Sequence, residues 1–400
     1  MKTIVFLGSH KSGSSYEAIR AADGMGYYTV LLTDRPSYID KRLEFPHAHS
    51  VRLCHLDDRD EIGGAIDRLV MERFDICAIV SFVDPHCLTA SQMSGRYGLK
   101  GFSEAAVAAM LDKVKSRELL KRTPYSPFFH VSDNPALPLK AARELPLVLK
   151  SPLSSGSKDV YPARTAEEYR KVFLLLKKQY PSVPVLAEKY IDGPQVLIET
   201  LTAGGKTHIA AMVEQEVTFT GRFIITGYRM PAAPDDISPL GKAAKAIVRL
   251  FGMEDGPCHL ELRQGRGGWV LIEANPRISG GAMNVLIQTA AGVDLAGETL
   301  KCALGLPFCV EPKCLRETYL QYITADEGGV LEKVTGKTAA QNSPGVERVY
   351  VKPKKGTVLS PPLSMGHRYA YVIATGASGE EAKANAKTAA EKIKFHLSPV

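Results

Sequence analysis

The chain has 400 residues, of which 45% are hydrophobic and 23% charged, as is typical of a globular protein with more than one domain. No apolar run is long enough to cross a bilayer, and an early glycine argues against a signal peptide. The net charge of +7 is dispersed, and we interpret the short basic runs at 177–178 and 352–355 as solvated faces. Nucleic-acid binding is therefore not expected, whereas an anionic small-molecule substrate is.

Strands and helices alternate in the first part of the chain, with strands predicted over 3–7, 28–33 and 76–82. Together with the intervening helices, predicted over 15–25 and 60–72, this alternation predicts a parallel sheet covered by helices. The loop after the first strand has the spacing Gly-x-x-x-x-Gly rather than Gly-x-Gly-x-x-Gly, so NAD binding is not expected.

Asp84 and Pro85 follow the third of these strands. Ligands gather at the carboxyl ends of parallel strands, so both residues are candidates for a substrate site. An ordinary strand-to-helix turn, with Asp84 near the helix cap, explains them equally well. Beyond them the pattern is helical over 105–111 and 112–121, and a proline-rich linker is predicted over 123–138.

Two isolated lysines are candidates for phosphate binding, since neither a Walker A loop nor a protein-kinase signature is present. Lys150 ends an apolar strand predicted over 145–150, and Lys113 lies in the second helical stretch. An ammonium group at a low-dielectric wall binds phosphate strongly, although a lysine at a strand end is also commonly a surface residue. The loop after Lys150 offers backbone N–H groups and small hydroxyls to phosphates.

A strand predicted over 185–189 continues into the extended segment 188–191 and a Gly-Pro turn. Such a segment presents backbone groups to a flat purine, or it is simply a linker between strands. The strands and the helix predicted next lie at 196–201, 207–213, 214–220, 223–226 and 237–251.

The most informative segment is a hairpin, with strands predicted over 258–263 and 269–275. Glu273 and Asn275 share a face, and in ordinary register Glu261 projects beside them. Three oxygen ligands on one side of a sheet suit Mg²⁺ that also holds phosphates. The alternative is a half-buried hairpin whose acids are merely solvated.

Asn275 is followed by Pro276 and Arg277. Proline lacks the N–H group that the ladder needs, so the strand ends there and the arginine lies on a turn. A fixed cation at that point can meet charge that develops during a reaction. After a helix predicted over 282–291, the chain from about residue 307 is strand-rich and closes with an amphipathic helix.

In chain order these elements resemble the ATP-grasp family of carboxylate–amine ligases over roughly residues 105–305, and the full layout is most similar to bacterial dipeptide-forming L-amino acid ligases. The resemblance implies an α/β protein with an N-terminal Rossmann-like parallel-sheet domain, an ATP-grasp module of two α+β subdomains clasping ATP, and a strand-rich C-terminal portion. The expected boundaries are 1–105, 106–186, 187–306 and 307–400.

The resemblance also implies roles for individual residues. The residues expected to bind ATP are Lys113, Lys150, Ser154, Gly156, Ser157, Lys158, Glu188, Lys189, Tyr190, Ile191 and Gln195. Mg²⁺, expected as two ions, is assigned to Glu261, Glu273 and Asn275. Arg277 and the N–H groups of Gly280 and Gly281 are expected to stabilise the acyl phosphate and the tetrahedral intermediate. Apart from the resemblance, we also expect Asp84, Pro85, Tyr228 and Arg229 to form walls of the amino-acid pocket.

Two departures from the family pattern concern the ATP site. Gln195 stands where the family has an acid for the ribose, and Gly156 is the single glycine of the phosphate loop. The implied reaction phosphorylates the carboxylate of one amino acid with ATP, after which the amine of a second amino acid attacks to give a dipeptide, ADP and phosphate.

The expected partners are therefore ATP and free amino acids, with no nucleic acid and no membrane, and a homodimer is left open. Seven cysteines without a Cys-x-x-Cys pair predict reduced thiols in a cytoplasmic protein. The alternatives are another ATP-grasp ligase, of the purine-pathway, biotin-carboxylase-like or peptide-tagging kind, and a non-catalytic nucleotide-binding regulatory protein.

Overall fold

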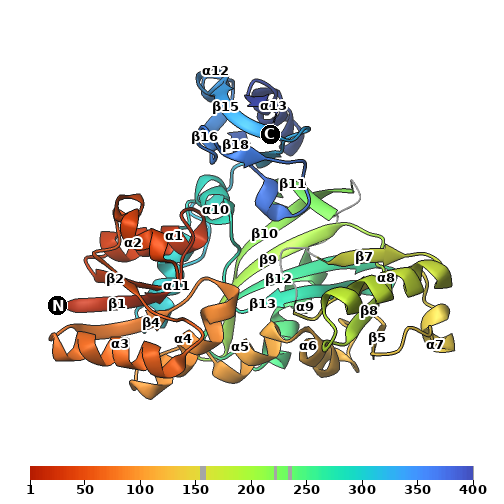
Figure 1. Ribbon diagram of the computed structural model, residues 1–400, viewed down its shortest axis with the longest axis horizontal. Helices are drawn as coiled ribbons and strands as arrows, with labels where there is room; N and C mark the ends of the chain where they lie inside the picture. Colours follow the sequence, from red (N-terminus) through yellow and green to blue (C-terminus); the bar gives the residue numbers. More distant parts are fainter. Residues whose placement is uncertain (154–158, 220–222, 233–236, 400) are drawn as a thin grey trace.

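A computed structural model describes residues 1–153, 159–219, 223–232 and 237–399 (Figure 1). The N-terminal part is a parallel four-stranded sheet in the order β3-β2-β1-β4, as predicted. Its strands are β1 (Lys2–Leu7), β2 (Tyr28–Thr33), β3 (Ser50–Leu53) and β4 (Asp75–Val80). Its main helices are α1 (Ser14–Gly24), α3 (Arg59–Met71) and α4 (Asp84–Arg96). The edge strand β3 was not predicted, because four residues are too few to show a period.

A second sheet is antiparallel, in the order β5-β8-β6-β7. Its strands are β5 (Phe129–Ser132), β8 (Val185–Lys189), β6 (Leu147–Lys150) and β7 (Val160–Ala163). Helix α8 (Ala166–Gln179) begins at the cap Thr165 and contributes Tyr169, Phe173 and Leu176 to the core of this sheet. The prediction of a linker over 123–138 is wrong at β5, which pairs with β8 at the edge of the sheet.

The largest sheet has eight strands in the order β13-β12-β9-β10-β11-β14-β18-β16. From the middle of the chain come β9 (Gln195–Ala203), β10 (Lys206–Phe219), β11 (Phe223–Met230), β12 (Gly256–Gly265) and β13 (Gly268–Asn275). From the C-terminal portion come β14 (Thr318–Ile323), β16 (Val346–Val351) and β18 (Ala370–Thr375). Strand β10 is continuous where two strands were predicted, because its polar centre continues the ladder with β11.

The remaining elements cover these sheets. The helices are α5 (Glu104–Leu111), α6 (Lys113–Leu120), α9 (Ser238–Leu250), α10 (Met283–Ala291), α11 (Leu295–Ala303), α12 (Lys337–Gln341) and α13 (Gly379–Glu391), with the short α2 (Pro36–Asp40) and α7 (Leu139–Ala142). A small sheet joins β17 (Val358–Leu359), β15 (Gly329–Thr335) and β19 (Lys394–Ser398). No helix in the described part of the chain is long and apolar enough to span a membrane.

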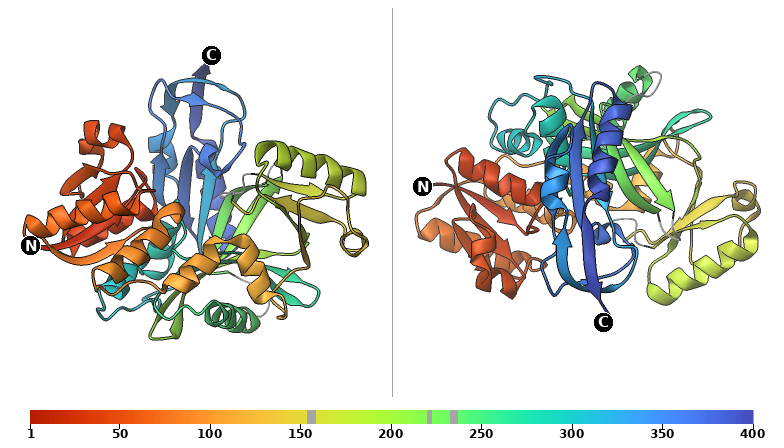
Figure 2. Two further views of the ribbon diagram at one scale, coloured as in Figure 1. Left: turned by 60° about the horizontal axis from the view of Figure 1, so that its bottom comes forward. Right: turned by 90° about the horizontal axis from the view of Figure 1, so that it is seen from above.

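The predicted mixed α/β fold class is confirmed, and Figure 2 shows the N-terminal sheet and the antiparallel four-stranded sheet on opposite sides of the C-terminal strands. One hydrophobic core joins the first and the largest sheets, since Phe6 and Leu31 cluster with Leu197 and Leu320. Helix α5 begins at Glu104 and strand β8 begins at Val185. The predicted boundaries at 105 and 186 therefore fall inside these two elements. The boundary at 306 lies in a loop and stays a prediction.

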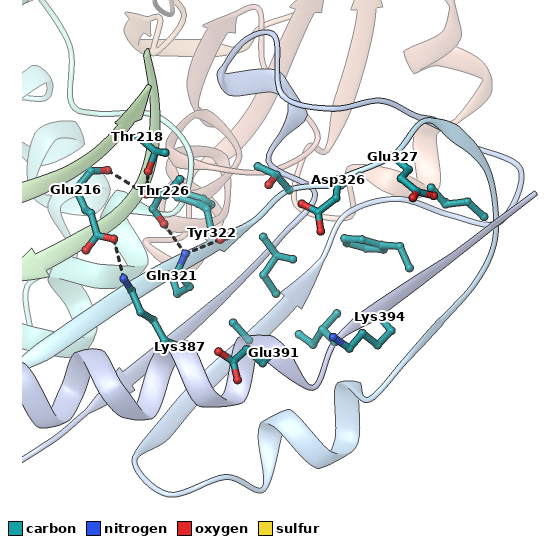
Figure 3. A pocket seen from close by; sticks show the side chains of 17 residues that line it. Glu216, Thr218, Thr226, Gln321, Tyr322, Asp326, Glu327, Lys387, Glu391 and Lys394 are labelled. Atoms are coloured by element: carbon teal, nitrogen blue, oxygen red, sulfur yellow. Dashed lines mark hydrogen bonds and ion pairs between the residues drawn. The ribbon is translucent and has the colours of Figure 1, made fainter. Parts of the chain in front are cut away.

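A cavity beside the C-terminal helix α13 is lined by several charged groups, of which Glu216 and Lys387 form an ion pair (Figure 3). Glu216 of β10 contacts the ammonium groups of Lys383 and Lys387, each at 2.7 Å, and accepts a hydrogen bond from Tyr319 at 2.8 Å. Burial raises the pKa of Glu216, but these hydrogen bonds outweigh burial and lower it to about 2. The carboxylate is therefore satisfied within the protein.

Replacing Glu216 by glutamine should destabilise the protein at pH 7 by about 1–2 kcal/mol. A carboxyl group whose pKa is lower in the folded state stabilises that state above its unfolded pKa, near 4.5, and loses this effect as the pH falls toward about 2. Urea unfolding should therefore show a difference between the two proteins that narrows as the pH falls below about 4.5. A difference that stays constant down to pH 3 would contradict this role of the charge.

Candidate active site

A cavity opens between the antiparallel four-stranded sheet and the eight-stranded sheet, and we name it the inter-sheet cavity. Its apolar walls come from both sheets and from the C-terminal portion, namely Val148, Val160, Ile191, Val217, Phe223, Ile225, Ile272 and Met365. Nine of the predicted residues line it, namely apolar Ile191 and the polar residues Lys113, Lys150, Glu188, Lys189, Tyr190, Gln195, Glu261 and Glu273. Ser154, Gly156, Ser157 and Lys158 lie outside the described residues.

Two carboxylates meet at this cavity, because Glu261 of β12 stands directly opposite Glu273 of β13. The predicted hairpin register is thus confirmed, and Asn275 follows two residues later opposite His259. Like charges directly opposite on a sheet repel each other. In this structure Lys113 Nζ lies 3.3 Å from Glu273, and His259 Nε2 lies 3.5 Å from Glu261.

The carboxylate pair suits a divalent cation, since both side chains supply oxygen ligands at the inter-sheet cavity. In the described part of the chain, no three His, Cys, Asp or Glu side chains gather as a metal-holding group. The predicted set has only two carboxylates, with an amide as its third member. Such a set leaves coordination positions for phosphate oxygens and water, as is usual for Mg²⁺.

Gln195 bridges two side chains of the sheet instead of standing alone at the cavity wall. Its amide nitrogen donates to Glu261 at 2.9 Å, and its oxygen accepts from Arg263 Nε at 2.7 Å. Arg263 also donates to the carbonyl of Ile191 at 2.8 Å. The amide predicted to contact a ribose therefore also orients one member of the carboxylate pair.

Glu188 is buried between two cations. Its carboxylate oxygens lie 2.5 Å from Arg117 Nε and 2.6 Å from Lys150 Nζ. Burial lowers the pKa of Lys150, whereas in Glu188 the two cations outweigh burial and hold the carboxyl pKa below its ordinary value. Because this carboxylate is engaged, Glu188 itself offers only its backbone to a purine.

Arg117 was missed by the sequence analysis. It lies four residues after Lys113 on α6, so both side chains share one helix face, and this spacing was the signal available. Its Nη2 donates to the carbonyl of Ile272 at 2.5 Å, which ties α6 to strand β13.

Replacing Glu188 by glutamine should lower the free energy of unfolding by about 3 kcal/mol, because two buried cations lose their counter-charge. Urea denaturation measures this change. The matched control is Glu144→Gln, which removes the partner of the exposed Lys189 and should cost less than about 1 kcal/mol. Equal effects of the two substitutions would contradict the importance of burial.

Arg277 is held by a residue that the sequence analysis treated separately. Its Nε and Nη2 donate to the two carboxylate oxygens of Asp84, each at 2.6 Å, and Nη1 donates to the carbonyl of Ile278. Burial lowers the pKa of Arg277, but Asp84 outweighs burial and raises it. Asp84 is thus both the first residue of α4 and an anchor for Arg277, and its role in an amino-acid pocket stays a prediction.

A second buried acid, also missed, lies beneath the turn that follows Arg277. Glu199 of β9 is fully buried, pairs with His259 Nδ1 at 2.7 Å and accepts from the backbone N–H of Ser279 at 3.2 Å. Burial lowers the pKa of His259, but Glu199 and Glu261 outweigh burial and raise it. Glu199 lies in a buried strand that also contains Thr200 and Thr202, and nothing in this local pattern indicated its role.

The other residues predicted near the amino-acid pocket lie in different places in the structure. Gly281 lines a second cavity, described below, while Gly280 is exposed beside it. Tyr228 is buried and meets Tyr322 edge to face, with ring centroids 5.9 Å apart. Arg229 turns to the other side of the sheet, where it lies 3.5 Å from Glu380, and it lines neither cavity. Pro85 lies in the first turn of α4.

The second cavity lies between the N-terminal sheet and the C-terminal strands. It is lined by the loop 11–13 and α1, by Gly281 to Val285, and by residues of β14, β16 and β18 with the segments beside them. Met365 lines both cavities, so they adjoin each other.

Two domain families match the chain. Residues 143–285 match the ATP-grasp domain, and residues 321–398 match the second C-terminal domain of L-amino acid ligases. An uncharacterized protein of Sinorhizobium fredii is 26% identical over 99% of this chain and 83% of its own length. An L-arginine-specific L-amino acid ligase of Bacillus subtilis is 24% identical over 56% of this chain, and the match spans 57% of that ligase.

Solved structures share the fold. An L-amino acid ligase from Bacillus licheniformis matches with a TM-score of 0.84 at 20% identity, covering 100% of this chain and 99% of the other. A phosphoribosylglycinamide synthetase from Anaerococcus prevotii matches with a TM-score of 0.78 at 14% identity, covering 99% and 100%. The chain therefore contains an ATP-grasp domain and a domain that matches the second C-terminal domain of L-amino acid ligases. Its fold as a whole is similar to that of the Bacillus licheniformis L-amino acid ligase.

Proposed function

We propose that the protein is an ATP-dependent ligase that joins two free amino acids into a dipeptide. The observation that carries the proposal is the carboxylate pair Glu261 and Glu273 in the inter-sheet cavity, which Lys113 and Lys150 also line. Arg277 lies two residues beyond the strand that holds Glu273, so a proposed metal ligand and the proposed acyl-stabilising arginine lie close together in the chain.

In the first step a carboxylate oxygen of one amino acid attacks the terminal phosphorus of ATP. The bond from this phosphorus to the bridging oxygen breaks, which gives an aminoacyl phosphate and ADP. Lys113 and Lys150 position the phosphates. Glu261, Glu273 and Asn275 would hold Mg²⁺, which when bound neutralises the transferring group.

In the second step the amine of the other amino acid attacks the acyl carbon, loses a proton, and inorganic phosphate leaves. Arg277, fixed by Asp84, and the N–H groups of Gly280 and Gly281 stabilise the oxyanion. The free amine has a pKa of about 8, so an unprotonated fraction is available at neutral pH without a dedicated base.

The test is release of ADP over pairs of amino acids, with hydroxylamine added to trap the acyl phosphate as a hydroxamate. ADP formation that depends on amino acids, together with dipeptide in the product, supports the proposal. Release of AMP would overturn the mechanism. ADP formation with other carboxylates and amines would keep the ligase chemistry but replace the substrates, and nucleotide binding without turnover would favour a regulatory protein.

A further inference from the structure

The second cavity carries an excess of positive charge. Arg348, Lys352 and Arg368 line it, and within the described part of the chain none of these three lies within 4.0 Å of a carboxylate. Lys11, which also lines the cavity, differs because it pairs with Glu44 at 2.5 Å. Arginines and lysines that converge without acids form a binding site for an anion.

Arg368 is the most constrained of the three. Its guanidinium lies over the ring of Tyr322 at 3.9 Å from the centroid, and Nε donates to the carbonyl of Met365 at 3.1 Å. Its Nη1 is buried and makes no hydrogen bond. Burial lowers the pKa of Arg368, but Tyr322 and a side-chain hydrogen bond with Tyr228 outweigh burial and raise it, so a fixed, charged guanidinium forms part of the cavity wall.

The single carboxylate that lines the cavity does not balance these cations. Glu17 of α1 is buried and already forms an ion pair with Arg20. The remaining polar lining comes largely from tyrosines, among them Tyr350 and Tyr371, which stack with centroids 5.2 Å apart. Their hydroxyl groups add hydrogen-bond donors of the kind an anion accepts.

The position of the cavity links it to the proposed reaction. A side-chain carbon built on Gly281 would lie 3.0 Å from the hydroxyl of Tyr322 and 3.7 Å from Arg368 Nη2, so the turn and the cationic wall are adjacent. Met365 separates this wall from the inter-sheet cavity. The carboxylate that reacts must lie toward the ATP phosphates, so the cations at the far wall meet an anionic group that does not react. The α-carboxylate of the amine-donating amino acid is one such group, and the paired acidic and neutral substrates below distinguish it from a side-chain anion.

We propose that the second cavity selects an amino-acid substrate with a second anionic group, a side-chain carboxylate or a phosphate, held by Arg348, Lys352 and Arg368. This inference rests on the proposed ligase function and adds its substrate class. It predicts that acidic amino acids are preferred to neutral ones of the same shape.

The experiment measures ADP release by the full-length protein with aspartate against asparagine, glutamate against glutamine, and phosphoserine against serine. The acidic member of at least one pair should have a KM at least about tenfold lower, since one well-placed charge pair contributes over about 1.4 kcal/mol. The carboxylate and phosphate pairs distinguish the two kinds of anion.

Lys352→Met should raise the KM of the preferred acidic substrate about tenfold with little change in kcat, since it removes a charge that binds the substrate without stabilising the reacting group. The matched control is Lys355→Met, because Lys355 is an exposed lysine three residues away that does not line the cavity. Lys352→Glu should reduce or reverse the preference for the acidic substrate.

Preference for the neutral member of every pair would overturn this inference and leave the ligase function intact. Failure to form ADP with any pair would instead overturn the proposed function. Calorimetric titration with glutamate and phosphoserine then tests the anion site independently of turnover. Binding that is weakened by Lys352→Met supports the site, and absence of binding overturns it.

Discussion

Replacing Glu273 by glutamine is expected to slow ADP formation about a thousandfold while leaving the protein folded. Glu273 faces Glu261 across the hairpin, and the loss of one carboxylate halves the negative charge available to a cation. Metal stabilisation of a transferring phosphoryl group amounts to several kcal/mol, of which about 4 correspond to this factor. Folding should persist because Glu273 is only half-buried and glutamine has the same shape.

The measurement is a coupled ADP assay at several Mg²⁺ concentrations, together with circular dichroism of both proteins. A partial recovery at high Mg²⁺ is expected if Glu273 acts as a ligand. Glu332→Gln provides the control, since Glu332 is an exposed residue of β15 that lines neither the inter-sheet cavity nor the second cavity. A Glu273→Gln protein that turns over within tenfold of the unchanged enzyme would remove this residue from the site.

The second large effect is expected at Arg277, whose replacement by alanine should reduce turnover about 100- to 1,000-fold, as does the loss of one oxyanion donor. Lysine should not restore the rate, because a point charge cannot reproduce the two hydrogen bonds to Asp84. Asp84→Asn should have a smaller effect, about tenfold, if Asp84 acts only by orienting the guanidinium.

The double substitution Asp84→Asn with Arg277→Ala tests this arrangement. Two residues that act as one unit are not additive, so the double variant should be no slower than Arg277→Ala alone. Steady-state kcat of the four proteins gives the coupling directly. Fully additive losses would show that Asp84 has a separate function, such as direct contact with the substrate.

The hairpin and its two acids were predictable because their information is local. A period of two, a glycine-rich turn and Pro276 fix the strands and their ends, and the register then places Glu261 opposite Glu273. Lys113 and Lys150 could be singled out for a related reason. Lys113 begins α6 and Lys150 ends β6, and both positions can be recognised from the local sequence.

The partners of these residues were not predictable from pattern. Arg117 meets Glu188 across 71 positions and Arg277 meets Asp84 across 193, so no local period records either pair. The surroundings of Lys352 were not predictable either. Lys352 lies in the short basic run 352–355, which we interpreted from the sequence as a solvated face. Its neighbours across the cavity come from the N-terminal loop and from Gly281, and only the fold brings them together.

The strand order of the eight-stranded sheet has a consequence for shortened forms of the chain. Strand β11 pairs on one side with β10 and on the other with β14, from Gly227 opposite Gln321 to Met230 opposite Thr318. A chain cut before β14 would leave the backbone groups of β11 as an open edge, and an open edge recruits other chains into intermolecular sheets. By pairing with β11, the C-terminal portion therefore also protects the chain from aggregation, independently of any ligand that it binds.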